Sequence, residues 1–377
     1  MKVLLLARYW RLPAPSRYRF YQYLPFLEQT GLQFTLAPLL DDNYVRLQYA
    51  SRKFPLLPLP RIYARRITDL LRARAFDLIW LEKEALPWIP SWVEHALGLG
   101  RVPYVVDYDD ACFHTYDQNR HAIVRGLLGR KIASLMRRAA LVVAGNEYLA
   151  DYARRAGAKW IEYLPSVVEL RKYPCQEPKP VNDVFTIGWM GAPANSRHLA
   201  RIADVLVEVC REGAARVRII GGWQTALPAA LPVEYRAWSE ETEFSEMRQF
   251  DVGVMPLYDG PWERGKCGLK LINYMAAGLP TIASPVGVNS SIVEHGVTGF
   301  LADSNEEWIT AFRALQHDHS LRRAMGDAGR AKVEREYCVE VVAHRLARWL
   351  WMAGGRTPTA VSASSLLSMG PHSERPH

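Results

Sequence analysis

The sequence predicts an α/β protein with two doubly wound domains, each built on a parallel sheet that helices cover on both faces. Short apolar runs alternate with stretches of helical apolar spacing along the chain, and this alternation is typical of such sheets. The succession starts again after a segment rich in proline and charge at 171–183. The length of 377 residues suits two domains of about 150 to 180 residues each.

The predicted strands are the short apolar runs, taken in chain order. In the first half they are 3–7, 34–37, 78–81, 104–106 and 141–144, with a further short strand near 162–164. In the second half they are 186–190, 217–220, 252–255, 281–283 and 300–301. Helices are expected in the longer stretches between these runs.

These elements set the predicted domain boundaries. The N-terminal domain covers 1–170, the segment 171–183 is a linker, and the C-terminal domain covers 184–336. A final helix is predicted at 337–353, with a return to the N-terminal domain left open. The polar residues 354–377 lack periodicity and are expected to form a disordered tail.

Composition and cysteine usage narrow the class of protein. With 49% hydrophobic and 23% charged residues, the chain is typical of soluble globular proteins. The opening apolar run is too short for a signal peptide or a membrane span, and it is interpreted as the first buried strand. Five cysteines without close pairing give neither a disulfide framework nor a zinc pattern. We therefore expect a cytoplasmic protein.

The net charge of +8 lies entirely in the first half of the chain, where residues 1–170 contain 24 Lys+Arg and 16 Asp+Glu, against 23 of each in the remainder. Much of the excess falls in 61–76 and 125–139, which also show helical apolar spacing. Taken as one helix, 125–139 suits two interpretations: a basic amphipathic helix that docks on anionic lipid, or a core-facing helix with a solvated basic side. A nucleic-acid partner is not expected, because no recognised binding module accompanies the charge.

The segment Gly265–Ser284 carries the strongest functional signal. Apolar residues at three- and four-residue spacing predict a helix there, and Gly278 and Pro280 are its stop signals. The apolar residues are Leu269, Ile272, Met275 and Ala276. Lys266 and Lys270 bracket the helix start, where cations oppose the helix dipole at a cost of roughly 0.3 to 1 kcal/mol each.

That cost changes sign if one anion binds both ammonium groups and the free N–H groups of the first helical turn. The nearby glycines leave room for close approach, so a phosphate or diphosphate site is predicted at Lys266, Gly268, Leu269 and Lys270. Asn273 falls near the same helix face and can bond a neutral hydroxyl beyond the charged group. A phosphate followed by a sugar hydroxyl is the layout of a nucleotide-sugar site. The alternative is that both lysines are solvated surface residues.

The run Arg264–Pro280, with Asp251–Leu257 before it and Ser284–Val288 and Gly296–Leu301 after it, resembles the donor-binding core of glycosyltransferase family 4, the glycosyl transferases group 1. The resemblance implies a GT-B fold, in which two Rossmann-like domains face a central cleft, with the acceptor at the N-terminal domain and the donor at the C-terminal domain. It also implies a nucleotide-diphosphate sugar as donor, retention of anomeric configuration, and no need for a metal or a cofactor.

The chain departs from the family pattern at two positions. Members often carry two glutamates eight residues apart, where this chain has Gly265 and Asn273. Asn273 can still bond the donor ribose. The sugar contact of the first glutamate is then lost, moved to Glu263, or made by backbone N–H groups. In the family's other phosphate-binding element, Arg197 is expected to bind the diphosphate, with a plain surface role as the alternative.

The resemblance also places contacts outside the phosphate site. The nucleotide base is expected against a loop and helix at 233–238, with Val233 and Trp238 as contacts. Trp238 suits stacking on a base, although a core role is the alternative. Arg17 and Arg19 open a helix after the first strand, and we expect them to meet the donor phosphates or an anionic acceptor.

Acidic residues follow the strand at 104–106. Asp109, Asp110 and His114 are the predicted catalytic residues, because the family has a histidine just after this strand, and a carboxylate or imidazole can bond the sugar or take the acceptor proton. The alternative is that Asp109 or Asp110 caps the next helix. The Asp-x-Asp-Asp pattern also resembles a metal site, which retaining GT-B enzymes as a class do not need.

The predicted function is a retaining glycosyltransferase that moves a sugar from a nucleotide-diphosphate donor to a hydroxyl of a glycan, lipid-linked or small-molecule acceptor. One alternative is a GT-B epimerase or phosphorylase. Another is a non-catalytic nucleotide-sugar-binding or membrane-surface protein, motivated by Gly265 and Asn273. Peripheral association of the basic N-terminal domain with an anionic membrane is left open.

Overall fold

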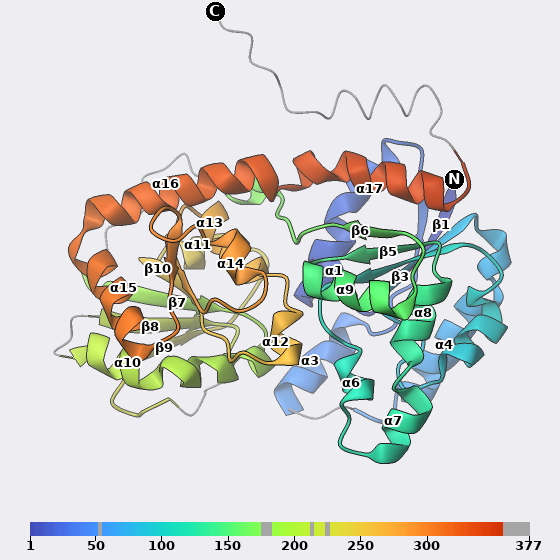
Figure 1. The fold of residues 1–377 in the computed structure, drawn as a ribbon, viewed down its shortest axis with the longest axis horizontal. Coiled ribbons are helices and arrows are strands. Elements are labelled where there is room, and N and C mark those ends of the chain that lie inside the picture. The colour runs from blue at the N-terminus through green and yellow to red at the C-terminus, as the bar shows by residue number, and fades with distance from the viewer. Residues whose placement is uncertain (52–54, 175–182, 212–214, 223–226, 357–377) are drawn as a thin grey trace, which may run out of the picture. The chain divides into compact units, whose positions relative to one another are not determined.

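The computed structural model describes residues 1–51, 55–174, 183–211, 215–222 and 227–356 (Figure 1). They form two compact units, the first from Met1–Ser166 together with the chain from Val339 onward, and the second from Val167–Cys338. The predictions for linker residues 175–182 and tail residues 357–377 lie outside the described part of the chain.

The first unit is built on a six-stranded parallel sheet. Its strands are β1 (Lys2–Leu6), β2 (Gln33–Leu36), β3 (Leu78–Glu82), β4 (Tyr104–Tyr108), β5 (Leu141–Ala144) and β6 (Ile161–Tyr163). They lie in the order β2-β1-β3-β4-β5-β6, and each pairing is parallel. Every residue of β3, β4 and β5 is buried, as expected for central strands of a sheet covered on both faces.

The helices of this unit lie between the strands and at the end of the chain. They are α1 (Ala14–Arg19), α2 (Leu24–Glu28), α3 (Asp42–Ser51), α4 (Leu59–Leu71), α5 (Ser91–Glu94), α6 (His114–Asp117), α7 (Ala122–Leu128), α8 (Lys131–Arg138), α9 (Glu147–Ala156) and α17 (Val339–Ala353). Asn146 caps α9 by accepting a hydrogen bond from the Leu149 N–H. The final helix α17 packs against α2 and β4, with Leu346 and Trp349 buried.

The segment 125–139 forms parts of two helices, not the single amphipathic helix expected from its sequence. The break falls at Gly129, where an added Cβ would lie 2.4 Å from the Arg125 carbonyl oxygen, and glycine is a poor helix former. The two apolar faces consequently point in different directions. Ile132 and Leu135 of α8 are in the core, whereas Leu127 of α7 is 71% exposed. The core-facing interpretation therefore holds for α8, whereas α7 buries Leu128 and leaves Leu127 in solvent.

The second unit carries a second six-stranded parallel sheet. Its strands are β7 (Phe185–Met190), β8 (Ala215–Ile220), β9 (Val233–Arg236), β10 (Val252–Met255), β11 (Thr281–Ala283) and β12 (Gly299–Leu301). They lie in the order β12-β11-β10-β7-β8-β9, and each pairing is parallel.

The helices of the second unit are the 3-10 helix η5 (Pro193–Ile202) and α10 (Ala203–Val209), α11 (Glu243–Met247), α12 (Pro261–Arg264), α13 (Leu269–Ala276), α14 (Asn289–Ile292), α15 (Asn305–His317) and α16 (His319–Glu336). Helix α13 contains the four apolar residues from which it was predicted, and the stop signal Gly278 follows its end in the left-handed conformation. Helix α15 begins with a capping box between Ser304 and Glu307.

Strand β9 corrects the prediction of a loop and helix at 233–238. Its four residues alternate between the core and solvent, because Val233 and Tyr235 pack against the core while Arg236 is exposed. A period of two is the signal of a strand at the edge of a sheet, and the sequence at 233–236 carries it. Each of the strands that was predicted is present, so the two parallel sheets confirm the predicted fold class.

Candidate functional site

The topology of the second unit identifies one edge of its sheet as the place for a ligand. The chain passes from β7 to β8 and β9 on one side, and then to β10, β11 and β12 on the other. The strand order therefore reverses between β7 and β10. Ligands of doubly wound sheets bind outside the carboxyl ends of the strands at such a point. The loops there are 191–192 after β7 and 256–268 after β10, which includes α12.

Helix α13 begins at this edge with its first turn available for an anion. Gly268 precedes it in the left-handed conformation, with φ 66°, and an added Cβ there would lie 2.2 Å from Ile292. No side chain caps this helix, and its first turn has no acidic residue. The Leu271 N–H donates to the Gly268 carbonyl, and a turn with neither a side-chain cap nor a carboxylate favours an external anion at the start of the helix.

Lys270 lies close to the loop that follows β7. Its ammonium group is 5.3 Å from the centre of the Trp189 ring, and its Cε atom would be 2.6 Å from a Cβ added at Gly191. A residue larger than glycine at 191 would therefore displace the lysine stem. This contact brings the predicted phosphate lysine against the carboxyl end of β7 (Phe185–Met190), at the switch point of the sheet.

Polar side chains from η5 and from the loop before α13 meet beside Lys270. The Arg197 guanidinium lies 3.4 Å from Glu263 Oε1, and His198 Nε2 lies 3.7 Å from the same oxygen. The Lys266 ammonium donates to Asn195 Oδ1 at 3.4 Å. The structure thus brings together three of the predicted residues, Arg197, Glu263 and Lys266. Arg197 stands on the 3-10 helix η5.

His198 was not predicted, and it is the most deeply placed group of this cluster. Its side chain is buried, and neither ring nitrogen has a hydrogen-bond partner among the described residues. Burial, reinforced by the charges of Lys266, Arg197 and Lys270, lowers the pKa of His198 to about 3. The imidazole is therefore neutral in the free protein. The pKa shift has the sign expected for a histidine in a cationic, poorly solvated site.

Of the remaining predicted residues of this unit, Asn273 and Trp238 lie on or beside elements at the proposed site, whereas Val233 lies farther away. Asn273 is buried on α13, and its Oδ1 has no hydrogen bond within the described residues. Trp238 packs on Gly221, directly after β8, and its indole N–H donates to Glu243. Val233 is the first residue of β9. It lies three residues before the carboxyl end of that strand, and at about 3.3 Å per residue this places it roughly 10 Å from the edge where a ligand is expected.

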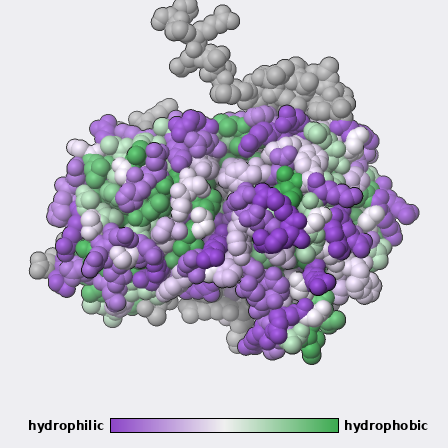
Figure 2. All heavy atoms as spheres, in the orientation of Figure 1, coloured by the Kyte–Doolittle hydropathy of each residue, from purple (hydrophilic) through white to green (hydrophobic). Residues whose placement is uncertain are grey.

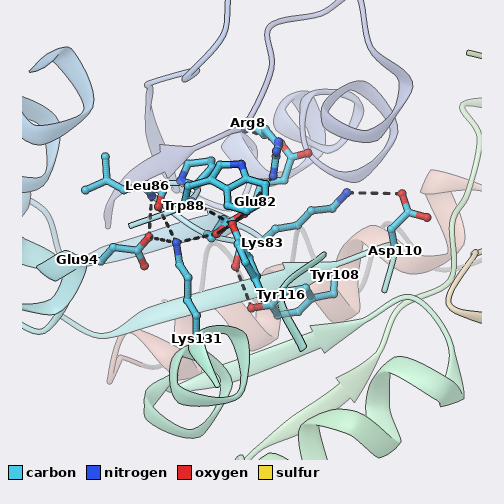
Figure 3. Close-up of polar contacts among 12 residues, drawn as sticks. Arg8, Glu82, Lys83, Leu86, Trp88, Glu94, Tyr108, Asp110, Tyr116 and Lys131 are labelled. Atoms are coloured by element: carbon cyan, nitrogen blue, oxygen red, sulfur yellow. Dashed lines mark hydrogen bonds and ion pairs between the residues drawn. The ribbon is translucent and has the colours of Figure 1, made fainter. Parts of the chain in front are cut away.

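In the first unit, two of the predicted acidic residues lie beside Lys83, and Figure 3 shows its contact with Asp110. Lys83 Nζ lies 2.7 Å from Asp109 Oδ1 and 3.7 Å from Asp110 Oδ2. Burial alone would raise the pKa of Asp109, but the Lys83 ammonium outweighs it and holds that pKa below the ordinary value. Asp109 is therefore an ionised hydrogen-bond acceptor, and a weak base.

The backbone holds Lys83 in place at the end of β3. Lys83 has φ 62°, a left-handed conformation that costs a residue with a side chain of order 1 to 3 kcal/mol. The Lys83 N–H donates to the Asp107 carbonyl, and its own carbonyl accepts from Tyr108 Oη at 2.8 Å. These two bonds to β4 keep the lysine next to Asp109.

A second lysine in the first unit forms a buried hub, drawn in Figure 3. Lys131 Nζ lies 2.7 Å from Glu84 Oε2 and 3.0 Å from Glu94 Oε1, and it donates to the Leu86 carbonyl at 2.6 Å. Tyr116 Oη donates to Glu84 at 2.8 Å. The sequence placed Lys131 on a solvated basic face, and the structure corrects this by burying it among carboxylates.

Two further predicted residues, Arg17 and Arg19, have structural partners in the first unit. Arg19 is buried against Asp107 and donates to the Leu164 carbonyl at 2.7 Å, so its guanidinium ties strand ends together. Arg17 is also buried and donates to the Leu12 carbonyl. Both side chains thus donate to groups of the first unit, and their contact with the donor phosphates or an anionic acceptor stays a prediction.

His114 opens α6, apart from the ion pairs of Lys83. Its Nδ1 lies 2.8 Å from Asp117 Oδ1, and its Nε2 lies 2.8 Å from Tyr148 Oη. Both ring nitrogens are thus engaged with neighbours in this unit. The Asp-x-Asp-Asp pattern is also divided, because Asp107 pairs with Arg19 while Asp109 and Asp110 face Lys83. In the described part of the chain, no three His, Cys, Asp or Glu side chains are grouped as metal ligands.

The residues that sequence reasoning missed carried a recognisable signal. Glu82, Lys83 and Glu84 follow the apolar run of β3 directly, and parallel strands bring their carboxyl ends to one edge. A charged triplet at that edge is thereby placed beside the acids that follow β4. Similarly, Asn195 and His198 lie in the polar stretch after β7, close to the predicted Arg197.

The second unit is thus a parallel α/β unit with lysines at an uncapped helix start, and phosphate groups commonly bind at such helix starts at the switch point of a sheet. Residues 182–318 match the family described as glycosyl transferases group 1. This match confirms the resemblance stated from the sequence.

Relatives of known name agree over parts of the chain. A D-inositol 3-phosphate glycosyltransferase of Pseudarthrobacter chlorophenolicus is 33% identical over 112 residues, which is 29% of this chain and 24% of that protein. A sulfoquinovosyl transferase of Arabidopsis thaliana is 28% identical over 163 residues, 40% of this chain and 30% of that protein. The chain thus matches about a quarter to a third of the length of these relatives.

Solved structures agree over nearly the whole chain. Anabaena HepE, solved with UDP and glucose, superposes with a TM-score of 0.66 at 16% identity, covering 92% of this chain and 98% of HepE. WaaG, a glycosyltransferase involved in lipopolysaccharide biosynthesis, gives a TM-score of 0.65 at 12% identity, covering 93% and 99%. At such identities the likeness shows the fold, which is the two-domain GT-B fold.

Proposed function

We propose that the protein is a glycosyltransferase that transfers a sugar from a nucleotide-diphosphate sugar to an acceptor hydroxyl with retention of configuration. The observation that carries this proposal is the convergence of Lys266, Lys270 and Arg197 at the uncapped start of α13. The match of residues 182–318 to glycosyl transferases group 1 supports it.

The proposed chemistry follows from where negative charge develops. The bond between the anomeric carbon and the phosphate oxygen breaks, the acceptor oxygen forms the new glycosidic bond, and the acceptor proton is released. Negative charge grows on the leaving diphosphate. Cations and helix N–H groups that are already in position stabilise this charge without the cost of reorienting. In this proposal Lys266, Lys270 and Arg197 bind the diphosphate, and Asn273 bonds the ribose.

In this proposal, side chains of the first unit act on the hydroxyl group of the acceptor substrate. Asp109 is held ionised by Lys83, so it suits an oxygen that orients a sugar hydroxyl better than one that removes a proton at neutral pH. His114 is kept as the candidate base, with Asp117 fixing its ring. The donor needs no metal in this scheme, because side-chain cations stand where a metal would neutralise charge.

The donor is tested with a thermal-shift panel of nucleotide sugars. A donor present at about 100 times its dissociation constant is expected to add roughly 2.7 kcal/mol of stability, which is readily visible as a shift in melting temperature. UDP-, GDP-, ADP- and TDP-linked sugars should be compared with the free diphosphates. If neither the sugars nor the diphosphates shift the transition, the proposed donor site is refuted.

Product analysis separates the competing functions. A glycosyltransferase releases the nucleoside diphosphate and forms an acceptor glycoside with the donor's anomeric configuration. An epimerase returns a changed sugar, and a phosphorylase yields a sugar phosphate. A donor that binds and is never consumed with any acceptor favours the non-catalytic alternative that Gly265 motivates.

A membrane surface is proposed as a further partner through α7. Ile123 and Leu127, one helical turn apart, are 76% and 71% exposed, and Arg120, Arg125 and Arg130 are exposed around them. Figure 2 shows apolar and hydrophilic atoms side by side at the lower end of the view, where Figure 1 places α7. Among the described helices none is both long and apolar enough to cross a bilayer, so the proposed association is peripheral.

Vesicle sedimentation tests this partner. The double variant Ile123→Ser with Leu127→Ser is expected to bind anionic vesicles at least about tenfold more weakly, because each apolar side chain is worth roughly 1.5 to 3 kcal/mol when fully buried. Binding should also weaken with added salt. Leu47→Ser, at another exposed leucine of the same unit, is the control. Equal binding by all three proteins would remove α7 from the proposal.

A further inference from the structure

His198 lies among the cations of the candidate diphosphate site and has no hydrogen bond of its own. It is 3% exposed, and neither Nδ1 nor Nε2 has a hydrogen-bond partner within the described residues. Burying polar groups without partners costs free energy. Such a group in a ligand site indicates that the ligand provides the missing partner.

The groups that face His198 define what that partner is. Arg197 lies on its own helix, and Lys266 and Lys270 lower its pKa from the other side of the site. Glu263 Oε1 is 3.7 Å from Nε2, and the Tyr258 ring lies 6.2 Å away. Three cations against one carboxylate leave a positive excess, so an anion completes the set. A phosphate oxygen accepts hydrogen bonds only, and it can therefore satisfy an imidazole N–H.

We propose that His198 is a fourth ligand of the donor diphosphate, and that it takes up a proton when the anion binds. This inference rests on the proposed function and adds a residue and a proton to it. His198 is thereby a binding residue whose charge appears only with the substrate. Without a ligand, the neutral His198 adds no charge to the three cations. With the diphosphate bound, the protonated His198 is the fourth positive charge.

The direction of the pH effect follows from linkage. In the free protein, burial and then Lys266, Arg197 and Lys270 lower the pKa of His198 to about 3. A bound diphosphate neutralises these cations and accepts the N–H, so the pKa rises on binding. Binding that raises a pKa takes up protons, so the affinity increases as the pH falls through the pKa of the complex toward that of the free protein.

Calorimetry with inorganic pyrophosphate as the probe tests this directly. Titrations of the full chain in two buffers with different ionisation enthalpies give the number of protons taken up, at about pH 6 and about pH 8. At about pH 6, wild type is expected to take up roughly half to one proton more per site than His198→Asn. At about pH 8, this difference between the two proteins should be smaller. Comparing the two proteins cancels the titration of pyrophosphate itself.

Affinity supplies the second readout. At about pH 6, His198→Asn should bind pyrophosphate roughly tenfold more weakly, the scale of one hydrogen bond to a charged group. His198→Gln, which keeps a donor N–H, should recover part of that affinity without proton uptake. His344→Asn is the matched control, because His344 belongs to the first unit and its pKa is also lowered by burial.

The outcomes separate the two proposals. If pyrophosphate binds wild type and Lys270→Ala equally, or does not bind at all, the diphosphate site itself is refuted. If binding depends on Lys270 while wild type and His198→Asn take up the same number of protons, the role of His198 is overturned and the diphosphate site stands. A purely structural role for His198 changes stability and leaves the proton count unaltered.

Discussion

Replacing Lys270 with alanine is expected to lower turnover by about two orders of magnitude or more, the scale of losing one preorganised donor to developing charge. Lys270 stands in the first turn of α13, with its stem against Gly191 and its ammonium over the Trp189 ring. The substitution removes a charge from the place where the leaving diphosphate is proposed to form. Release of nucleoside diphosphate from the donor found in the panel measures the loss.

Two controls keep the interpretation of Lys270→Ala clear. Lys159→Ala removes an exposed lysine from the first unit and should leave turnover unchanged. The melting temperature of Lys270→Ala should stay near that of wild type, since Lys270 is only half-buried. Turnover within threefold of wild type, in a folded variant, would contradict the assignment of this lysine to the diphosphate.

Replacing Lys131 with methionine is expected to reduce the free energy of unfolding by about 3 to 5 kcal/mol, the cost of removing one partner from a buried ion pair. Lys131 is buried and bridges Glu84 and Glu94 while it donates to the Leu86 carbonyl. Methionine fills a similar volume, but it leaves Glu94 buried without a cation and Glu84 with Arg8 as its remaining cation. Chemical denaturation followed by circular dichroism measures the change.

Neighbouring variants distinguish charge from packing at this hub. Arg130→Met changes an exposed residue one position earlier and should alter stability by less than about 0.5 kcal/mol. The triple variant with Lys131→Met, Glu84→Gln and Glu94→Gln should recover part of the loss, because no buried charge is then left unpaired. Wild-type stability in Lys131→Met would show that the lysine is not needed to neutralise this cluster.

The contrast between Arg130 and Lys131 illustrates where sequence reasoning stops. Both were interpreted as part of one basic helical face, and helical periodicity cannot separate two adjacent basic residues when one helix ends at Leu128 and the next begins at Lys131. Arg19 gives the same lesson, since its place after the first strand was right while its partner, Asp107, lies 88 residues away. Ion pairs over such distances follow from strand order, which local patterns do not contain.

The sequence by itself determined what depends on local pattern: the succession of strands and helices, the α13 start with its two lysines, and the family of residues 182–318. Only the tertiary structure decided which charged groups meet, bringing His198 to the cations of Lys266 and Arg197 and burying Lys131 between carboxylates. The physical reason is that periodicity reports the faces of single elements. The pKa and the partner of a charged group depend on neighbours that the packing of distant elements supplies.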